Sequence, residues 1–149
     1  MSRIVVLGSG AWGTAIALSL HRHGVHQITL WAHSPEAAQE IVDAGENTLF
    51  LPGFPLPAEI AITGSESAVA DAEIVVSVVP SEFLRSTLKR LRPHLHEGQI
   101  IVSATKGVEN QTSTDDRGDR QQSRGSRPHL AGWRILRAFV CSGSRARPA

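Results

Sequence analysis

Short apolar runs, separated by glycine, proline and polar residues, dominate the N-terminal part of the chain. The runs rich in β-branched residues predict strands over residues 3–7, 27–32, 74–79 and 99–104, with a shorter strand at 59–63. In the first run, residues 4–7 are all apolar rather than alternating with polar residues. This pattern is typical of a strand that is buried on both faces of a parallel sheet.

Helical patterns lie between these strands. Residues 11–23 have helical spacing and end before Gly24, a residue type that commonly follows a helix. Ser34, followed by proline and glutamate, predicts the N-cap of a second helix that runs to about Ala44. The apolar face predicted for the first helix consists of Trp12, Ala15, Ile16, Ser19 and Leu20.

The rest of this region continues the alternation. A third helix is predicted over residues 82–91 with Ser81 as its N-cap, the prolines of 47–57 predict a loop, and residues 65–70 predict a helical turn. Strands that alternate with helices favour a parallel sheet with right-handed crossovers. The sequence therefore predicts an α/β protein with a doubly wound sheet, and its 149 residues suit a single domain.

A glycine-rich turn joins the first predicted strand to the first helix. Gly8, Gly10 and Gly13 form the pattern G-x-G-x-x-G, a weak signal alone, but its place between a strand and a helix is the context that dinucleotide binding requires. Gly8 permits the tight turn, Gly10 leaves room for a pyrophosphate, and Gly13 lets the helix approach the strand. The helix N-terminus offers N–H groups to the phosphates. We favour this interpretation over a structural turn without a ligand.

The end of the second strand bears on the choice of dinucleotide. A site for NAD places an acidic residue there to accept from the ribose hydroxyls, whereas this chain has no acid before Glu36. His33 and Ser34 could donate to a 2′-phosphate, so we expect NADP to be tolerated, with NAD as the other candidate. The alternative roles are a plain N-cap for Ser34 and a surface loop position for His33.

Other candidate groups are fewer. Lys106 follows the last predicted strand, at the edge where such sheets bind ligands, and could neutralise a phosphate; the alternative is a solvated surface lysine. Lys89, Arg90 and Arg92 lie near the end of a predicted helix, where the helix dipole explains them. The seven histidines have no spacing typical of a metal site, and one cysteine excludes an intramolecular disulfide.

Charge and composition change after residue 110. Residues 1–110 carry a net charge of −4, whereas 111–149 contain eight arginines and no lysine and carry +5. We expect a dinucleotide-binding domain followed by a mostly disordered basic tail, in which only 133–140 could form a short amphipathic helix. Nucleic-acid binding is disfavoured because no aromatic interleaving accompanies the arginines. The uncharged segment 4–20 is too short and glycine-rich for a membrane span or signal peptide.

Five motifs together carry a family resemblance. They are G-S-G-A-W-G-T from Gly8, W-A-H from Trp31, N-T-L-F-L-P-G from Asn47, V-V-P-S from Val78 and A-T-K-G from Ala104. Over residues 3–110 the chain resembles the N-terminal, Rossmann-type domain of bacterial-type NAD(P)-dependent glycerol-3-phosphate dehydrogenase. The A-T-K-G motif argues against the alternative of a ketopantoate or 2-hydroxyacid type of reductase.

The resemblance implies a cytoplasmic enzyme that reduces dihydroxyacetone phosphate to sn-glycerol 3-phosphate for phospholipid synthesis and forms a homodimer at full length. It implies that Ala11, Trp12 and His33 bind the cofactor and that Lys106 contacts both cofactor and substrate. The family's catalytic lysine lies in a C-terminal helical domain, which we expect this chain to lack. We therefore expect no catalytic residue here, and the alternative to an enzyme is an inactive dinucleotide-binding remnant.

The basic tail also has an explanation that requires no function. After A-T-K-G the family continues with L-R-M-x-E-V-I and later S-G-P-S-F-A-x-E-V, and neither stands in this chain. A shift of one nucleotide lets the codons of Thr112–Arg120 encode L-L-R-M-T-E-V-I and those of Leu136–Arg145 encode S-G-P-S-F-A-Q-E-V. We therefore expect a single-nucleotide insertion or deletion near codons 110–113.

Overall fold

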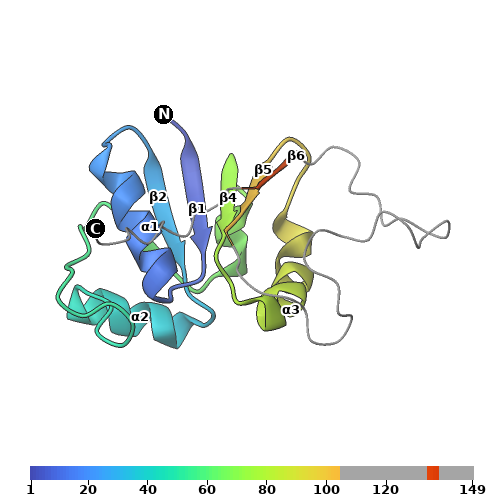
Figure 1. Cartoon of the computed structure of the whole chain (residues 1–149). Helices are drawn as coiled ribbons and strands as arrows, with labels where there is room; N and C mark the ends of the chain where they lie inside the picture. Colours follow the sequence, from blue (N-terminus) through green and yellow to red (C-terminus); the bar gives the residue numbers. More distant parts are fainter. Residues whose placement is uncertain (105–133, 138–149) are drawn as a thin grey trace, which may run out of the picture.

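The structure, a computed structural model, describes residues 1–104 and 134–137 and contains a six-stranded sheet (Figure 1). The strand order is β3-β2-β1-β4-β5-β6, and every neighbouring pair is parallel. This order confirms the doubly wound α/β class. The strands are β1 (Arg3–Leu7), β2 (Gln27–Trp31), β3 (Ala61–Thr63), β4 (Ile74–Ser77), β5 (Ile100–Ser103) and β6 (Arg134–Arg137).

Helices cover both faces of this sheet. Helices α1 and α2 lie on one side and α3 lies on the other (Figure 1). Their positions confirm the predicted alternation, and Ser34 caps α2 as predicted. The helices are α1 (Ala11–Arg22), α2 (Pro35–Ala44) and α3 (Ser81–Leu91), with short 3₁₀ turns η1 (Glu66–Val69) and η2 (Arg92–His94).

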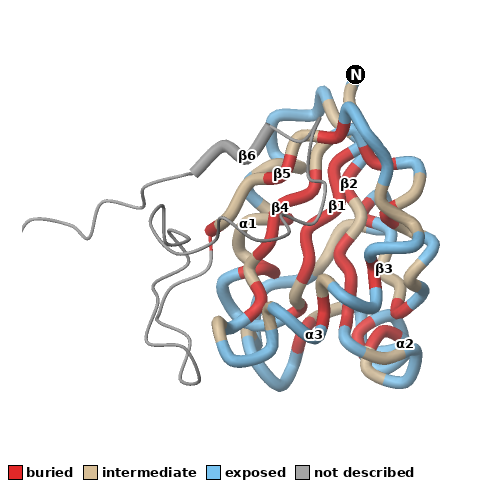
Figure 2. The backbone as a smooth tube through the Cα atoms, turned by 90° about the vertical axis from the view of Figure 1, so that its right-hand side faces the viewer, coloured by how far each residue is buried: buried red, intermediate tan, exposed pale blue. Residues whose placement is uncertain are grey.

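Because successive strand residues point to opposite faces, the strands supply two separate cores. Val5 and Leu7 of β1 join the core on the α3 side, and Ile4 and Val6 join the core on the α1 side. Figure 2 shows the resulting buried residues along the middle strands of the sheet. A strand that must be apolar on both faces explains why the β1 sequence does not alternate. Further members of the two cores include Trp31, Val75 and Leu91 on the first side and Ala17, Ile28 and Leu30 on the second.

The buried face of α1 differs from the prediction. Its buried residues are Gly13, Thr14 and Ala17, whereas Trp12 is 45% exposed and Ser19 is exposed. The helix lies so close to the sheet that only small side chains fit beneath it. Its larger apolar residues therefore pack at the margins of the core, which a search for a bulky apolar face does not anticipate.

The start of α3 also differs from the prediction, because Pro80 and not Ser81 is the N-cap. The carbonyl oxygen of Pro80 accepts a hydrogen bond from the Phe83 N–H at 2.9 Å. The proline ring fixes φ near −53°, and Pro80 has the extended ψ of a cap residue, so Ser81 becomes the first helical residue.

Residues Arg134–Arg137 form a strand, so the helix suggested for 133–140 is wrong there. They pair with β5 in parallel, from Ile100 opposite Arg134 to Ser103 opposite Arg137. Without them β5 would be an edge strand with unpaired backbone groups, which favours the addition of any short segment able to form a strand. The other expectations for the tail, and the boundary after residue 110, lie outside the described residues.

Candidate functional site

The glycine loop lies between β1 and α1, at the carboxyl edge of the sheet. Gly8 has φ of +111°, a conformation that other residues rarely adopt, so the tight turn needs glycine there. A Cβ atom at Gly13 would collide with the carbonyl oxygen of Gly8. These two positions confirm the predicted roles of turn formation and of close approach between helix and strand.

Gly10 is different, because neither its backbone nor its packing requires glycine. Its φ is −70°, and no atom of the described residues lies within 4 Å of a Cβ atom built on it. It is the N-cap of α1, where no side chain forms a capping hydrogen bond and the first turn carries no acidic residue. An open space therefore adjoins the N-terminus of this helix, which is the arrangement that attracts phosphate groups.

A buried amide holds the glycine loop in place. The Nδ2 group of Asn47, which is 2% exposed, donates to the carbonyl oxygen of Ser9 at 2.6 Å and to Oγ1 of Thr14 at 2.8 Å. Its Oδ1 atom accepts from the Phe50 N–H at 3.3 Å. Asn47 thus joins the loop of residues 47–57 to the glycine loop. The sequence motif N-T-L-F-L-P-G contained this residue, but nothing in its spacing indicated that it would reach the glycine loop.

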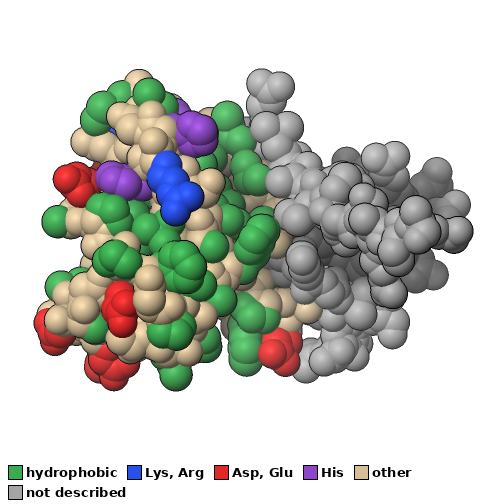
Figure 3. Space-filling view, turned by 60° about the vertical axis from the view of Figure 1, so that its left-hand side comes forward, with side chains coloured by type: hydrophobic (Ala, Val, Ile, Leu, Met, Phe, Trp, Pro, Cys, Tyr) green, Lys and Arg blue, Asp and Glu red, His purple; other side chains and the backbone are tan. Residues whose placement is uncertain are grey.

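The surface near this loop is rich in hydrophobic side chains. Ala11 and Trp12 form the exposed start of α1. Figure 3 shows hydrophobic side chains gathered on the side of the molecule on which α1 and α2 lie. Ala11 and Trp12 thus lie where an aromatic or planar ligand group could contact them. The exposed large hydrophobic residues of α1, α2 and the loop 47–57 are Trp12, Val42, Leu49, Phe50 and Phe54.

The end of β2 lies next to the glycine loop, since the Gly8 N–H donates to the Trp31 carbonyl oxygen at 3.0 Å. His33 is exposed there. The Ser34 hydroxyl oxygen accepts from the Ala37 N–H at 3.2 Å, so the predicted capping role is confirmed. The pKa of the exposed Glu36 carboxyl lies below its ordinary value of 4.5, first because its own backbone N–H bonds it and then because the Ser34 hydroxyl does.

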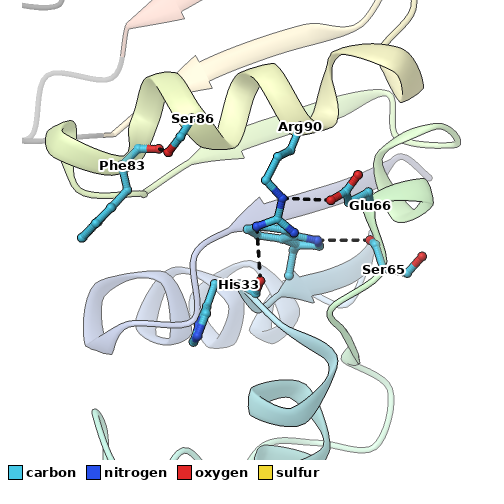
Figure 4. Close-up of polar contacts among 7 residues, drawn as sticks. His33, Ser65, Glu66, Phe83, Ser86 and Arg90 are labelled. Carbon is cyan, nitrogen blue, oxygen red and sulfur yellow. Dashed lines mark hydrogen bonds and ion pairs between the residues drawn. The ribbon is translucent and has the colours of Figure 1, made fainter.

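Arg90 also reaches the end of β2, a contact that the helix dipole does not explain (Figure 4). Its Nη1 donates to the His33 carbonyl oxygen at 3.5 Å, and its Nε pairs with Oε1 of Glu66 at 2.9 Å. Its guanidinium carbon lies 5.7 Å from the centre of the Trp31 ring, whose Nε1 donates to the Ser65 carbonyl oxygen. The sequence could not indicate this residue, because 57 positions separate it from His33.

The structure thus brings the glycine loop, Ala11, Trp12, His33 and Ser34 to one edge of the sheet, while Lys106 lies outside the described residues. Within the described residues, no group of three or more His, Cys, Asp and Glu side chains could hold a metal ion. None of the helices in that part of the chain is both long and apolar enough to cross a membrane.

A parallel sheet in the order 3-2-1-4-5-6, with a glycine loop before its first helix, defines a Rossmann-type dinucleotide-binding fold. A profile of the NAD-dependent glycerol-3-phosphate dehydrogenase N-terminus matches residues 3–116. The chain belongs to this family.

Individual relatives agree with this assignment. Glycerol-3-phosphate dehydrogenase [NAD(P)+] of Acidobacterium capsulatum is 48% identical over 116 residues, which cover 75% of this chain and 34% of that protein. The crystal structure of glycerol-3-phosphate dehydrogenase from Coxiella burnetii is 30% identical with a TM-score of 0.67, over 73% of this chain and 34% of that one. A ketopantoate reductase from Ralstonia eutropha, 23% identical with a TM-score of 0.62 over 91% of this chain and 40% of its own, shows the shared fold alone. The chain spans about a third of the length of the first two relatives.

Proposed function

We propose that this chain binds NAD or NADP, with the pyrophosphate at Gly10 and the N-terminus of α1. The observation that supports this most strongly is Gly10, which no feature of the fold requires to be glycine. A side chain there would extend into the open space beside the helix N-terminus, so a ligand that uses this space explains the residue. Ala11 and Trp12 would contact the cofactor from the first turn, and His33 from the end of β2.

The nicotinamide ring of such a cofactor supplies or accepts a hydride. This chain's own residues would bind and orient it: Asn47 fixes the loop that contacts the phosphates, and the backbone N–H groups of α1 provide partial positive charge. The names of the relatives support glycerol 3-phosphate as a substrate of the complete protein. We propose its sn form, with dihydroxyacetone phosphate as the oxidised counterpart and Lys106 as a contact to both the cofactor and the substrate. Reduction in the cytoplasm for phospholipid synthesis would be its biological role, and a homodimer its assembly.

Binding can be tested by titrating the 149-residue chain with NADPH and following tryptophan fluorescence, since Trp12 lies next to the proposed site. The parent should show a saturable change. Gly10→Val should abolish it, because a branched side chain would occupy the place of the pyrophosphate. Ser19→Val is the matched control, because it adds a similar side chain to an exposed position of the same helix. If Gly10→Val binds as tightly as the control, the proposed phosphate site is wrong.

Turnover is a separate test. For the polypeptide of these 149 residues we expect cofactor binding without reduction of dihydroxyacetone phosphate, because the match to the relatives covers only about a third of their length. The assay is the loss of NADPH absorbance in the presence of dihydroxyacetone phosphate. Clear turnover would show that the 149 residues contain a complete active site.

A further inference from the structure

The segment that ends β2 and begins α2, residues 31–36, contains no lysine or arginine for the extra phosphate of NADP. A residue near this point usually decides between the two cofactors, by an acid for the ribose hydroxyl or by a cation for the 2′-phosphate. The Ser34 hydroxyl oxygen already caps α2 by accepting from the Ala37 N–H, and the Glu36 carboxylate lies two residues further on. The negative charge of Glu36 would also repel a phosphate. His33 is therefore the one predicted donor left at this point of the chain.

Arg90 supplies the missing cation from a different part of the sequence. It comes from α3, on the opposite face of the sheet from α2, and its guanidinium still reaches the backbone of His33. Figure 4 shows Arg90 extending from α3 toward His33 and Glu66. A guanidinium is planar and always charged, and its N–H groups match the oxygens of a phosphate.

The surroundings of Arg90 fix its position without enclosing it. The Trp31 ring supports the guanidinium from one side, and this ring is itself buried and held by the Ser65 carbonyl oxygen. The side chains of Arg90 and Glu66 remain 48% and 36% exposed in their ion pair. Because an exposed ion pair of this kind contributes little to stability, a phosphate can compete with Glu66 for the guanidinium at small cost.

We propose that Arg90 determines cofactor specificity by binding the 2′-phosphate of NADP, with Glu66 as its partner when no phosphate is present. This proposal rests on the proposed cofactor binding at the glycine loop. The choice of cofactor then depends on Arg90 of α3 together with His33, and not only on the residues that directly follow β2.

The test compares NADPH and NADH affinities of the 149-residue chain by calorimetry, because replacing Arg90 changes the surroundings of Trp31 and would disturb fluorescence. Arg90→Gln should weaken NADPH binding by about tenfold or more, since it removes a charge-assisted contact, and should leave NADH binding nearly unchanged. Lys89→Gln is the matched control, because it removes the same charge from an exposed neighbouring position of α3. It should leave the ratio of the two affinities unchanged.

Glu66→Gln provides a second variant that keeps Arg90 in place. Removing the competing carboxylate should strengthen NADPH binding relative to NADH binding. Across the variants, the affinity for adenosine 2′,5′-bisphosphate should change as the NADPH affinity does, and the affinity for adenosine 5′-monophosphate as the NADH affinity does.

The outcomes separate the two proposals. If the parent binds neither NADH nor NADPH, the proposed function itself fails. If the parent binds both but Arg90→Gln weakens them equally, Arg90 only positions the loop after β2 and the specificity proposal is wrong. An unchanged affinity ratio in Glu66→Gln would also overturn it, even if Arg90→Gln failed to fold.

Discussion

Replacing Gly13 by alanine should damage the fold, whereas the same replacement at Gly10 should not. The new Cβ at position 13 would collide with the carbonyl oxygen of Gly8, a backbone atom in a turn that cannot rotate away as a flexible side chain would. Forcing an extra methyl group into a packed contact costs about 1–3 kcal/mol. Alanine recovers up to about 1 kcal/mol through its higher helix propensity. With a cost of about 2 kcal/mol, the middle of that range, we expect a net loss of about 1–2 kcal/mol.

The assay is urea or thermal denaturation followed by circular dichroism. A loss of this size corresponds to a fall in Tm of about 4–16 °C for a domain of roughly one hundred residues. Gly10→Ala is the matched control, since its methyl group would meet nothing within 4 Å, and its Tm should change less. If both variants melt at the same temperature as the parent, the close approach of α1 to the glycine loop is not a constraint and the argument is refuted.

The other predictions concern single contacts. Asn47→Ala should lower the free energy of unfolding by about 1–3 kcal/mol in denaturation experiments, because it removes the donor to the buried Ser9 carbonyl oxygen and Thr14 hydroxyl. An unchanged midpoint of denaturation would contradict this role of the amide. The pKa of Glu36 is lower in the folded protein than its ordinary value, so its carboxylate stabilises the fold above pH 4.5, and this effect is lost as the pH falls through the folded pKa. The Tm of Glu36→Gln should therefore lie below that of the parent at neutral pH and equal it in acid. His33→Ala should weaken NADPH more than NADH in calorimetric titrations, and equal losses would mean that His33 does not contact the 2′-phosphate. Resequencing the gene across codons 105–120 should either confirm one extra or missing nucleotide, which means a broken copy, or restore the family's reading frame, which means that the basic tail is an artefact; a shifted frame that encodes neither family motif would refute the frameshift hypothesis.

Local patterns were sufficient to predict most of the fold. The apolar strand β1 and the helix cap at Ser34 are both determined by residues that are adjacent in the sequence. The sequence alone is therefore enough to locate them. The face of α1 could not be predicted in the same way. It depends on how close the helix comes to the sheet, and that distance is set by Gly8 and Gly13 together.

Contacts that join distant segments account for what the sequence could not show at the site. Asn47 reaches Ser9 across 38 positions, and Arg90 reaches His33 across 57. Each side chain has a plausible local explanation, as a polar loop residue or as a cation near a helix end. These local explanations account for both residues without any distant contact. Nothing in the local sequence therefore indicates that Asn47 and Arg90 also make contacts with distant segments.

The three glycines of the loop show how structure adds evidence for function. Gly8 and Gly13 are accounted for by a positive φ and by a collision, so they would be required in a turn that binds nothing. Gly10 has an ordinary φ and open space, so folding gives no reason for the absence of a side chain. The sequence pattern does not distinguish the three glycines, whereas the structure separates two that the fold requires from one that it does not require. Gly10 is therefore the position at which substitution tests function with the least effect on stability.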